Sequence, residues 1–356
     1  MKAARLYGES DIRIDEDVPD NTVGPGDVRI NVDTCGICGS DLHEFRNPDA
    51  TPAETHPQTG AKRPVVIGHE FSGVVSEVGE DVTRLSVGDP VAVHPNIPCY
   101  ECVYCEDGEY NRCENVVSIG FHTGTGGFGE TTVIPQEHAH VLPNGIELWE
   151  GALVEPLAVG LHAVRRSSFD SGDTVAVFGG GPIGLTTVRA ARAAGAKQVF
   201  VSEPNEHRRA KAAELGADVT IDPFEEDAEE IIKRATEGGV EAAFEFAGAE
   251  PAFNAAVRST RRGGSITVGS LTDGEISTDM AEIVMKERTV TGTFCYGFPP
   301  RSFRTEFDAI IEAIDRGDVD TEAFVTGRIS LDDLVEEGYE QLLDPETEHV
   351  KILVEP

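Results

Sequence analysis

Three residues near the start of the chain could together hold a metal ion. Cys38, His69 and Glu70 offer a thiolate, an imidazole and a carboxylate, a donor set that suits Zn²⁺ better than magnesium or copper. Ser40 and His43 follow the cysteine closely, so a hydroxyl and a second imidazole could lie beside whatever the metal binds. Taken singly, Cys38 is better explained as a buried apolar cysteine and His69 as a core histidine. The combination predicts a catalytic site.

A second metal site is predicted by four cysteines in a polar loop. Their spacing is CxxCxxCx7C, and four thiolates at this spacing close a tetrahedral shell with no open position. An iron–sulfur cluster is the competing interpretation, because short CxxCxxC runs also bind such clusters. The gap of seven residues, without a proline after the last cysteine, favours zinc over the cluster and over two disulfides. The predicted structural zinc ligands are Cys99, Cys102, Cys105 and Cys113.

A glycine-rich turn in the middle of the chain predicts a dinucleotide site. The segment DTVAVFGGGPIG gives a strand, a turn with the spacing GxGxxG, and the start of an apolar-striped helix. The glycines are Gly179, Gly181 and Gly184, and Glu203 follows at the end of the next strand. Glycines there allow a tight turn and close approach of a pyrophosphate, whose charge meets the helix N-terminus.

The acidic residue Glu203, after the second strand of this segment, predicts which dinucleotide binds. Glu203 can accept hydrogen bonds from both ribose hydroxyls and would repel a 2′-phosphate, so NAD is favoured over NADP. Arg208 and Arg209 lie close by in sequence and keep NADP open as an alternative. The remaining residues that we assign to the cofactor site, together with Arg208, are Pro182, Ile183, Val268, Ser270, Phe294 and Tyr296.

The pattern of elements predicts an α/β chain of two domains. Short β-rich runs bounded by glycine and proline come first, typical of a small, mostly antiparallel β domain. From Asp173 strands and helices alternate, which predicts about six strands in a doubly wound parallel sheet. The last segment returns to the first domain. We therefore expect one domain over 1–155 and 297–356, with the cysteine lobe at 95–115, and a Rossmann domain over 156–296.

The charge of the chain is far from neutral. Among 356 residues, 29 Lys and Arg stand against 64 Asp and Glu, a net charge of −35. At molar salt the Debye length falls to about 3 Å, so such self-repulsion is screened. The composition predicts a halophile's cytoplasm, with no binding to nucleic acid or to an anionic membrane. The charged N-terminal segment predicts no signal peptide, and the seven cysteines predict metal binding rather than disulfides.

The order of these parts resembles the zinc-dependent medium-chain dehydrogenase family. CGICGSD and GHE are followed by the cysteine lobe, by EPLAV and by the dinucleotide fold. The resemblance implies a GroES-like catalytic domain and a catalytic zinc held by Cys38, His69 and Glu155, with Glu70 able to approach the metal or replace a ligand. It also implies a proton relay through Ser40 and His43, a homodimer or homotetramer, and two zinc ions per chain.

Short segments around the site look most like 2,3-butanediol dehydrogenases. These segments are DLHEF after Cys38, HPQTG before GHE, and FCYG at 294–297. The resemblance implies NAD-linked oxidation of a secondary alcohol, a vicinal diol or polyol, to the ketone. The alternatives are a sorbitol, other polyol or sugar dehydrogenase and an L-threonine 3-dehydrogenase. A zinc-ribbon module fused to a nucleotide-sensing fold is the non-enzyme alternative, and it would require a basic face that this charge opposes.

Overall fold

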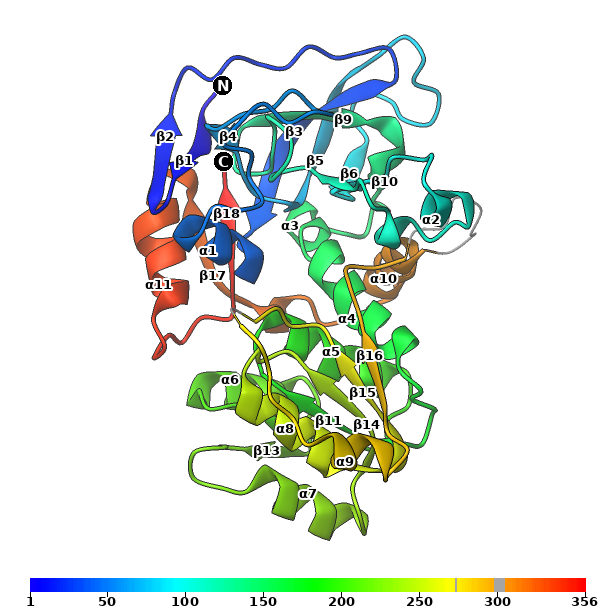
Figure 1. The fold of residues 1–356 in the computed structure, drawn as a ribbon. Coiled ribbons are helices and arrows are strands. Elements are labelled where there is room, and N and C mark those ends of the chain that lie inside the picture. Colours follow the sequence, from blue (N-terminus) through cyan, green and yellow to red (C-terminus); the bar gives the residue numbers. More distant parts are fainter. Residues whose placement is uncertain (273, 298–304) are drawn as a thin grey trace. The chain divides into compact units, whose positions relative to one another are not determined.

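The chain divides into two compact units in the computed structural model (Figure 1). The first unit combines Met1–Glu155 with Gly297–Pro356, and the second is Pro156–Tyr296. Within the described part of the chain, no helix has both the length and the apolar character that crossing a bilayer requires. The structure describes residues 1–272, 274–297 and 305–356.

Antiparallel strands dominate the first unit. Its main sheet has seven strands in the order β10-β6-β5-β3-β18-β17, and β9 also pairs with β3. The parallel pair β17–β18 is the exception among the described strands of this sheet. The bounds are β3 (Asp27–Gly36), β5 (Glu70–Val78), β6 (Pro90–Val93), β9 (Thr131–Pro135), β10 (Ala139–Val141), β17 (Val325–Ser330) and β18 (Lys351–Glu355).

Two smaller sheets and several short helices complete this unit. A three-stranded sheet has the order β2-β1-β4, and β7 pairs with β8. These strands are β1 (Ala3–Gly8), β2 (Asp11–Asp15), β4 (Val65–Val66), β7 (Asn96–Ile97) and β8 (Val117–Ser118). The helices are α1 (Gly39–Arg46), α2 (Val103–Glu106), α3 (Leu148–Gly151), α10 (Glu306–Asp315) and α11 (Glu340–Leu343). The single-turn elements are η1 (Tyr110–Arg112), η2 (Gln136–His138), η3 (Glu322–Phe324), η4 (Leu331–Asp333) and the π-helical η5 (Leu334–Tyr339).

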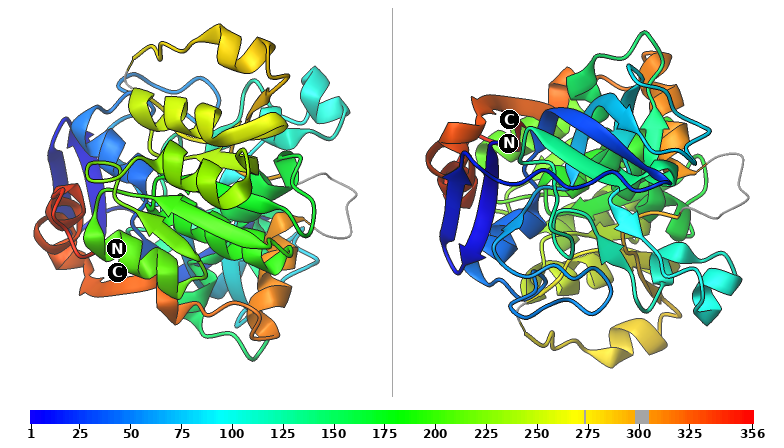
Figure 2. Two further views of the ribbon diagram at one scale, coloured as in Figure 1. Left: turned by 90° about the horizontal axis from the view of Figure 1, so that it is seen from below. Right: turned by 90° about the horizontal axis from the view of Figure 1, so that it is seen from above.

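A parallel sheet of six strands forms the second unit, in the order β13-β12-β11-β14-β15-β16. The central strand β11 is buried at every residue, as expected where helices cover both faces of a sheet (Figure 2). The strands are β11 (Thr174–Phe178), β12 (Gln198–Ser202), β13 (Val219–Ile221), β14 (Val240–Glu245), β15 (Thr260–Val268) and β16 (Thr289–Gly292). The helices are α5 (Pro182–Ala193), α6 (Glu206–Glu214), α7 (Ala228–Thr236), α8 (Glu250–Ser259) and α9 (Met280–Val284), while α4 (Val154–Arg166) starts at the boundary of the units. The predicted doubly wound sheet is confirmed.

Three histidines lie together beside α10 in the first unit. The ring of His94 is 5.5 Å from that of His138 and 6.1 Å from that of His140. Burial lowers the pKa of His138 to about 4 and that of His94 well below its ordinary value. His140 forms an ion pair with Asp308 on α10, and this contact lowers the pKa of the Asp308 carboxyl to about 2. The two buried rings are therefore neutral at physiological pH.

These neutral histidines should make the fold sensitive to acid. The unfolded chain binds protons at His138 below about pH 6.5, whereas the folded chain does so only near pH 4. Stability is therefore fully present above pH 6.5 and is lost as the pH falls through this window, by about 3 kcal/mol for His138 alone. Urea midpoints at pH 7.5 and 5 should differ less in His138→Gln than in the wild type. The control is His207→Gln at an exposed position, and equal pH dependence in all three proteins would contradict this origin.

Candidate active site

The three residues predicted to bind a catalytic metal come together in the first unit. Atoms of Cys38, His69 and Glu70 that could ligate a metal lie within 4.8 Å of one another. Neighbouring strands bring them together, because β3 ends just before Cys38, β5 begins at Glu70, and Gly36 pairs with Glu70 in the sheet. The residue before His69 is Gly68, whose φ of 93° only glycine adopts readily. This backbone conformation helps to place His69 in the cluster.

A fully buried carboxylate that the sequence analysis missed connects two of these residues. Asp41, in the first turn of α1, accepts a hydrogen bond from the backbone N–H of Cys38 at 2.8 Å. Its other oxygen, Oδ1, lies 3.3 Å from Nδ1 of His69. Burial alone would lower the pKa of His69, but the Asp41 carboxylate raises it well above its ordinary value. A carboxylate on Nδ1 is the usual partner of a metal-binding histidine, because it fixes the ring so that Nε2 can ligate.

The residues present fit a zinc ion. Glu70 is completely buried, and its Oε1 has no hydrogen-bond partner among the described residues. Glu155, predicted as the third ligand by resemblance, is also buried. Burial alone would lower the pKa of Lys351, but the charge of Glu70 and, to a smaller extent, that of Glu155 raise it. A half-buried thiol, a buried imidazole and two buried carboxylates form a donor set that a divalent cation would neutralise.

The two residues predicted to relay a proton lie on α1. Ser40 is 3.4 Å from the Nε2 atom of His69, measured from its hydroxyl oxygen. His43 is one helical turn further on, with its side chain 45% exposed and Nε2 3.6 Å from the carboxylate of Asp49. The exposed imidazole can exchange protons with solvent, whereas Ser40 lies beside a predicted metal ligand.

The four cysteines of the loop form a second cluster. Their sulfur atoms lie within 4.8 Å of one another, and Cys105 is 3.5 Å from Cys102 and 3.9 Å from Cys99. Zn–S bonds of about 2.3 Å in a tetrahedron give sulfur separations of about 3.8 Å. None of these cysteines forms a disulfide. Backbone N–H groups, above all that of Glu101, lower the pKa of Cys99 to about 6, whereas burial raises that of Cys105 to about 12. The cluster fits a closed zinc site whose fourth sulfur is that of Cys113.

The glycine-rich turn has the predicted strand–turn–helix form. β11 leads into Gly179, whose φ is 101°, and α5 begins at Pro182 with Gly181 as its N-cap. A Cβ atom on Gly184 would collide with the backbone oxygen of Gly179, so this contact between turn and helix requires glycine. Pro182 and Ile183 form the first turn of α5, where unpaired backbone N–H groups can meet a pyrophosphate.

Glu203 lies buried at the carboxyl end of β12, directly beside this turn. Its two oxygens accept hydrogen bonds from the backbone N–H groups of Gly180 at 2.6 Å and Asn205 at 2.9 Å. Arg209 forms an ion pair with Asp222 at 3.1 Å and donates to backbone carbonyls, so its charge is already matched. Arg208 has a buried Nε with no partner among the described residues. The carboxylate is therefore fixed where a ribose is expected.

Replacing Glu203 with alanine should weaken binding of NAD by about tenfold or more, because hydrogen bonds to a charged group contribute about 1.5–3 kcal/mol each. The discrimination against NADP should fall in the same variant. Fluorescence titration with the reduced cofactors measures both effects. Glu206→Ala, at an exposed position on α6, is the control, and an unchanged affinity for NADH in Glu203→Ala would contradict the assignment.

The remaining predicted cofactor residues occupy strand ends of the second unit. Val268 ends β15, and Ser270, two residues later, donates from its hydroxyl to the buried carboxylate of Glu245. Phe294 is exposed and Tyr296 is completely buried. The carboxyl ends of parallel strands are where dinucleotides bind in such sheets, so Val268 and Ser270 lie at the expected edge.

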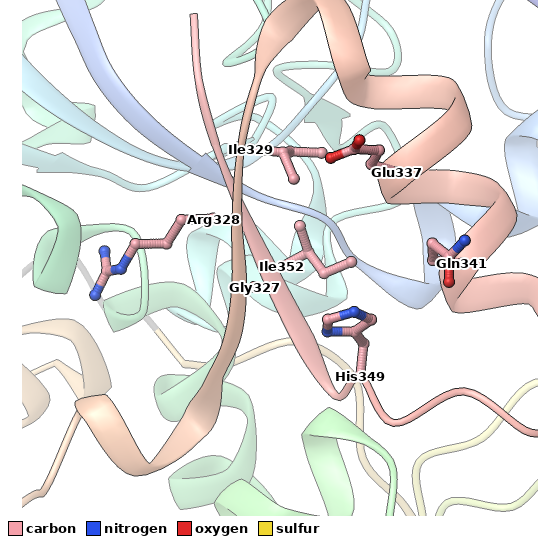
Figure 3. A pocket seen from close by; sticks show the side chains of 7 residues that line it. All are labelled: Gly327, Arg328, Ile329, Glu337, Gln341, His349 and Ile352. Atoms are coloured by element: carbon pink, nitrogen blue, oxygen red, sulfur yellow. The ribbon is translucent and has the colours of Figure 1, made fainter.

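A separate cavity of about 370 Å³ lies beside β17 and β18 (Figure 3). Ile352 contributes to its wall, whereas Lys351, the preceding residue of β18, directs its amino group to Glu70. Successive side chains of a strand point to opposite faces, so β18 separates this cavity from the ligand cluster. Its lining residues are Gly327, Arg328, Ile329, Glu337, Gln341, His349 and Ile352, none of which belongs to the predicted site.

Known proteins match the whole chain. Residues 24–144 match the family described as alcohol dehydrogenase GroES-like domain, and residues 182–315 match zinc-binding dehydrogenase. The chain is 42% identical to (R,R)-butanediol dehydrogenase of Bacillus subtilis, with 100% of both chains covered. It is 39% identical to the protein of the same name in Neisseria gonorrhoeae, covering 100% of this chain and 99% of that one.

A solved structure agrees with both units. The crystal structure of 2R,3R-butanediol dehydrogenase from Bacillus subtilis is similar with a TM-score of 0.91 and 40% identity, over 100% of this chain and 99% of that one. The GroES-like and Rossmann architectures expected from the sequence are thereby confirmed. With its thiol, imidazole and carboxylate cluster and its glycine-rich turn, the chain belongs to the zinc-dependent medium-chain dehydrogenase family, whose members are oxidoreductases that use zinc and NAD or NADP.

Proposed function

We propose that this protein oxidises a secondary alcohol, a vicinal diol such as 2,3-butanediol, to the ketone with NAD as hydride acceptor. The observation that carries the proposal is the cluster of Cys38, His69 and Glu70, which lies in a chain similar over its full length to butanediol dehydrogenases. A zinc ion held by Cys38, His69 and Glu155 would supply Lewis acidity that lowers the pKa of a substrate hydroxyl, and the nicotinamide would accept the hydride.

Residues around the cluster would transfer the proton of the substrate hydroxyl to solvent. Ser40, whose hydroxyl is 3.4 Å from the predicted metal ligand His69, accepts the proton that leaves the substrate hydroxyl. His43, one turn later on α1 and half-exposed, takes this proton from Ser40 and releases it to water. Asp41 holds the His69 ring and exchanges no proton. Four cysteines, Cys99, Cys102, Cys105 and Cys113, would hold the second, structural zinc.

The loop over 46–62 would determine which alcohol is accepted. Within it, the Thr59 hydroxyl donates to the backbone carbonyl of His122 at 2.6 Å. Phe121, the preceding residue, packs its ring 4.8 Å from that of His69. The loop is thus joined to the wall of the metal cluster, which supports a role in substrate selection. For the cofactor, the fixed Glu203 carboxylate and the matched charge of Arg209 favour NAD over NADP.

A panel of substrates at high salt tests the proposal. We expect two zinc ions per chain and a higher kcat/KM with NAD and 2,3-butanediol stereoisomers than with sorbitol, threonine, glucose or simple alcohols. A preference for sorbitol or threonine would show that the assigned substrate is wrong, while the proposed type of reaction would stand. A chain that binds one zinc or none would overturn the catalytic site.

We also propose that the protein works as a homodimer or homotetramer in a salt-rich cytoplasm. The net charge of −35 and seven cysteines outside disulfides support the compartment. For assembly, β16 is an edge strand with Val290 40% exposed, and α9 carries Met280 at 58% and Val284 at 67% exposure. Apolar side chains beside an unpaired strand edge suit pairing with a second copy. Sedimentation in molar salt measures the mass, and a monomer would contradict this assembly.

A further inference from the structure

A lysine from the far end of the chain lies buried against the metal cluster. Lys351, the first residue of β18, is 2% exposed, and its Nζ atom lies 2.5 Å from Oε2 of Glu70, which is completely buried. The same amino group donates to the backbone carbonyl of Ile37 at 2.9 Å. Lysines are almost never fully buried unless they are paired, so this contact defines where both side chains lie.

The backbone around this ion pair leaves little room for it to rearrange. β18 pairs with β3 through Leu353 and Gly36, so a sheet fixes the position of Lys351. Gly36 faces the pair directly: a Cβ atom there would collide with Oε2 of Glu70 and lie 3.5 Å from Cδ of Lys351. The carboxylate of Glu70 is therefore held by one oxygen against β3. Its other oxygen, Oε1, has no hydrogen-bond partner among the described residues.

Charge explains why a cation is needed beside the metal. Cys38, Glu70 and Glu155 are the anions whose fields act on Lys351. Asp41 beside His69 is a fourth, completely buried anion of this site. With a neutral His69, a zinc ion and one ammonium group compensate three of the four negative charges, whereas zinc alone compensates only two. Without its ammonium partner, the Glu70 carboxylate would be drawn to the strongest cation in reach, the metal itself.

We propose that Lys351 is a positioning residue that holds Glu70 away from the zinc, so that the resting ligands are Cys38, His69 and Glu155 and one position stays open for substrate. The inference rests on the proposed catalytic zinc. According to this proposal, Glu70 does not ligate zinc in the resting state. The C-terminal strand β18 then helps to determine how many protein ligands the zinc has.

Three variants test this role. Lys351→Met keeps the length of the side chain and removes the charge, Lys351→Arg keeps the charge, and Lys351→Met/Glu70→Gln removes both charges. In Lys351→Met we expect release of the catalytic zinc to a chelator to slow by roughly tenfold and kcat to fall by about 10–100-fold, the range found for residues that act on metal ligands indirectly. The cobalt-substituted protein reports coordination directly, since the four-cysteine site cancels in a difference spectrum against the wild type.

The cobalt spectrum of Lys351→Met should show the weaker bands of a higher coordination number. Lys351→Arg and the double variant should retain the wild-type spectrum and release rate. Should Lys351→Met fail to fold, Gly36→Ala displaces the same carboxylate without changing any charge, and it should give the same spectral change. If Lys351→Met folds and has the wild-type spectrum, or if Gly36→Ala has it, the proposed role of Lys351 is wrong. The proposed function is not affected by that result. A wild-type chain with a single zinc instead overturns the proposed function, and this role with it.

Discussion

Cys38→Ala is expected to reduce kcat by far more than 100-fold while the fold and the binding of NADH stay nearly unchanged. Loss of a residue that merely supports a metal ligand already costs about 10–100-fold, and Cys38 is proposed as a ligand itself. The residue lies between β3 and α1 in the first unit, whereas the glycine-rich turn belongs to the second unit. Zinc analysis should show one zinc per chain in place of two. Kinetics, circular dichroism and NADH titration together separate a catalytic loss from misfolding.

Cys35 provides the matched control for this experiment. It is three residues earlier, completely buried, and burial raises the pKa of its thiol well above the ordinary value, so it stays protonated. Cys35→Ala should lower stability slightly and retain both zinc ions and turnover. Substantial activity in Cys38→Ala would show that the catalytic metal assignment is wrong.

Cys102→Ala should act on stability before it acts on chemistry. Cys102 precedes α2, and its sulfur is 3.5 Å from that of Cys105 in the four-cysteine cluster. Structural zinc contributes about 10–16 kcal/mol of binding free energy in zinc-finger peptides, so an incomplete shell should cost several kcal/mol. The midpoint of thermal unfolding should fall by more than about 5 °C, since 1 kcal/mol corresponds to about 2–4 °C in domains of 150–250 residues.

The neighbouring residue Glu101 gives the control for this second prediction. Its side chain is exposed, and Glu101→Ala leaves its backbone N–H, which hydrogen-bonds Cys99, in place. This variant should unfold at the wild-type temperature. A Cys102→Ala protein with wild-type stability and two zinc ions would contradict a structural zinc in the loop.

Features that depend on local spacing could be predicted from the sequence. The four cysteines lie within one loop, and their sulfur atoms do form one cluster. The glycine-rich turn and Glu203 belong to a single strand–helix–strand unit, and the structure joins them through the bond from Gly180 to Glu203. The parallel sheet followed from alternating strands and helices. The four cysteines lie within 15 residues, and the parallel sheet repeats one local strand–helix unit, so a pattern of short range was enough to predict each feature.

Lys351 and Asp41 were missed for different reasons. Lys351 meets Glu70 across 281 positions of the chain, and a single sequence gives no signal for such a contact or for burying a lysine. Asp41 could have been found, since a carboxylate three residues after Cys38 fits the pattern of a helix-capping box. Glu155 came from the resemblance alone, because no spacing rule connects it to Cys38.

The ion pair between Lys351 and Glu70 also determines the order in which the two zinc sites are completed during synthesis of the chain. The ligands Cys99 and Cys113 are 14 residues apart, so the cysteine lobe can bind its zinc soon after it leaves the ribosome. The counter-ion of Glu70 is synthesised 281 residues after it. A ribosome-bound chain that lacks β18 should therefore carry the structural zinc but lack the full catalytic rate, which should appear only when the final strand enters the sheet.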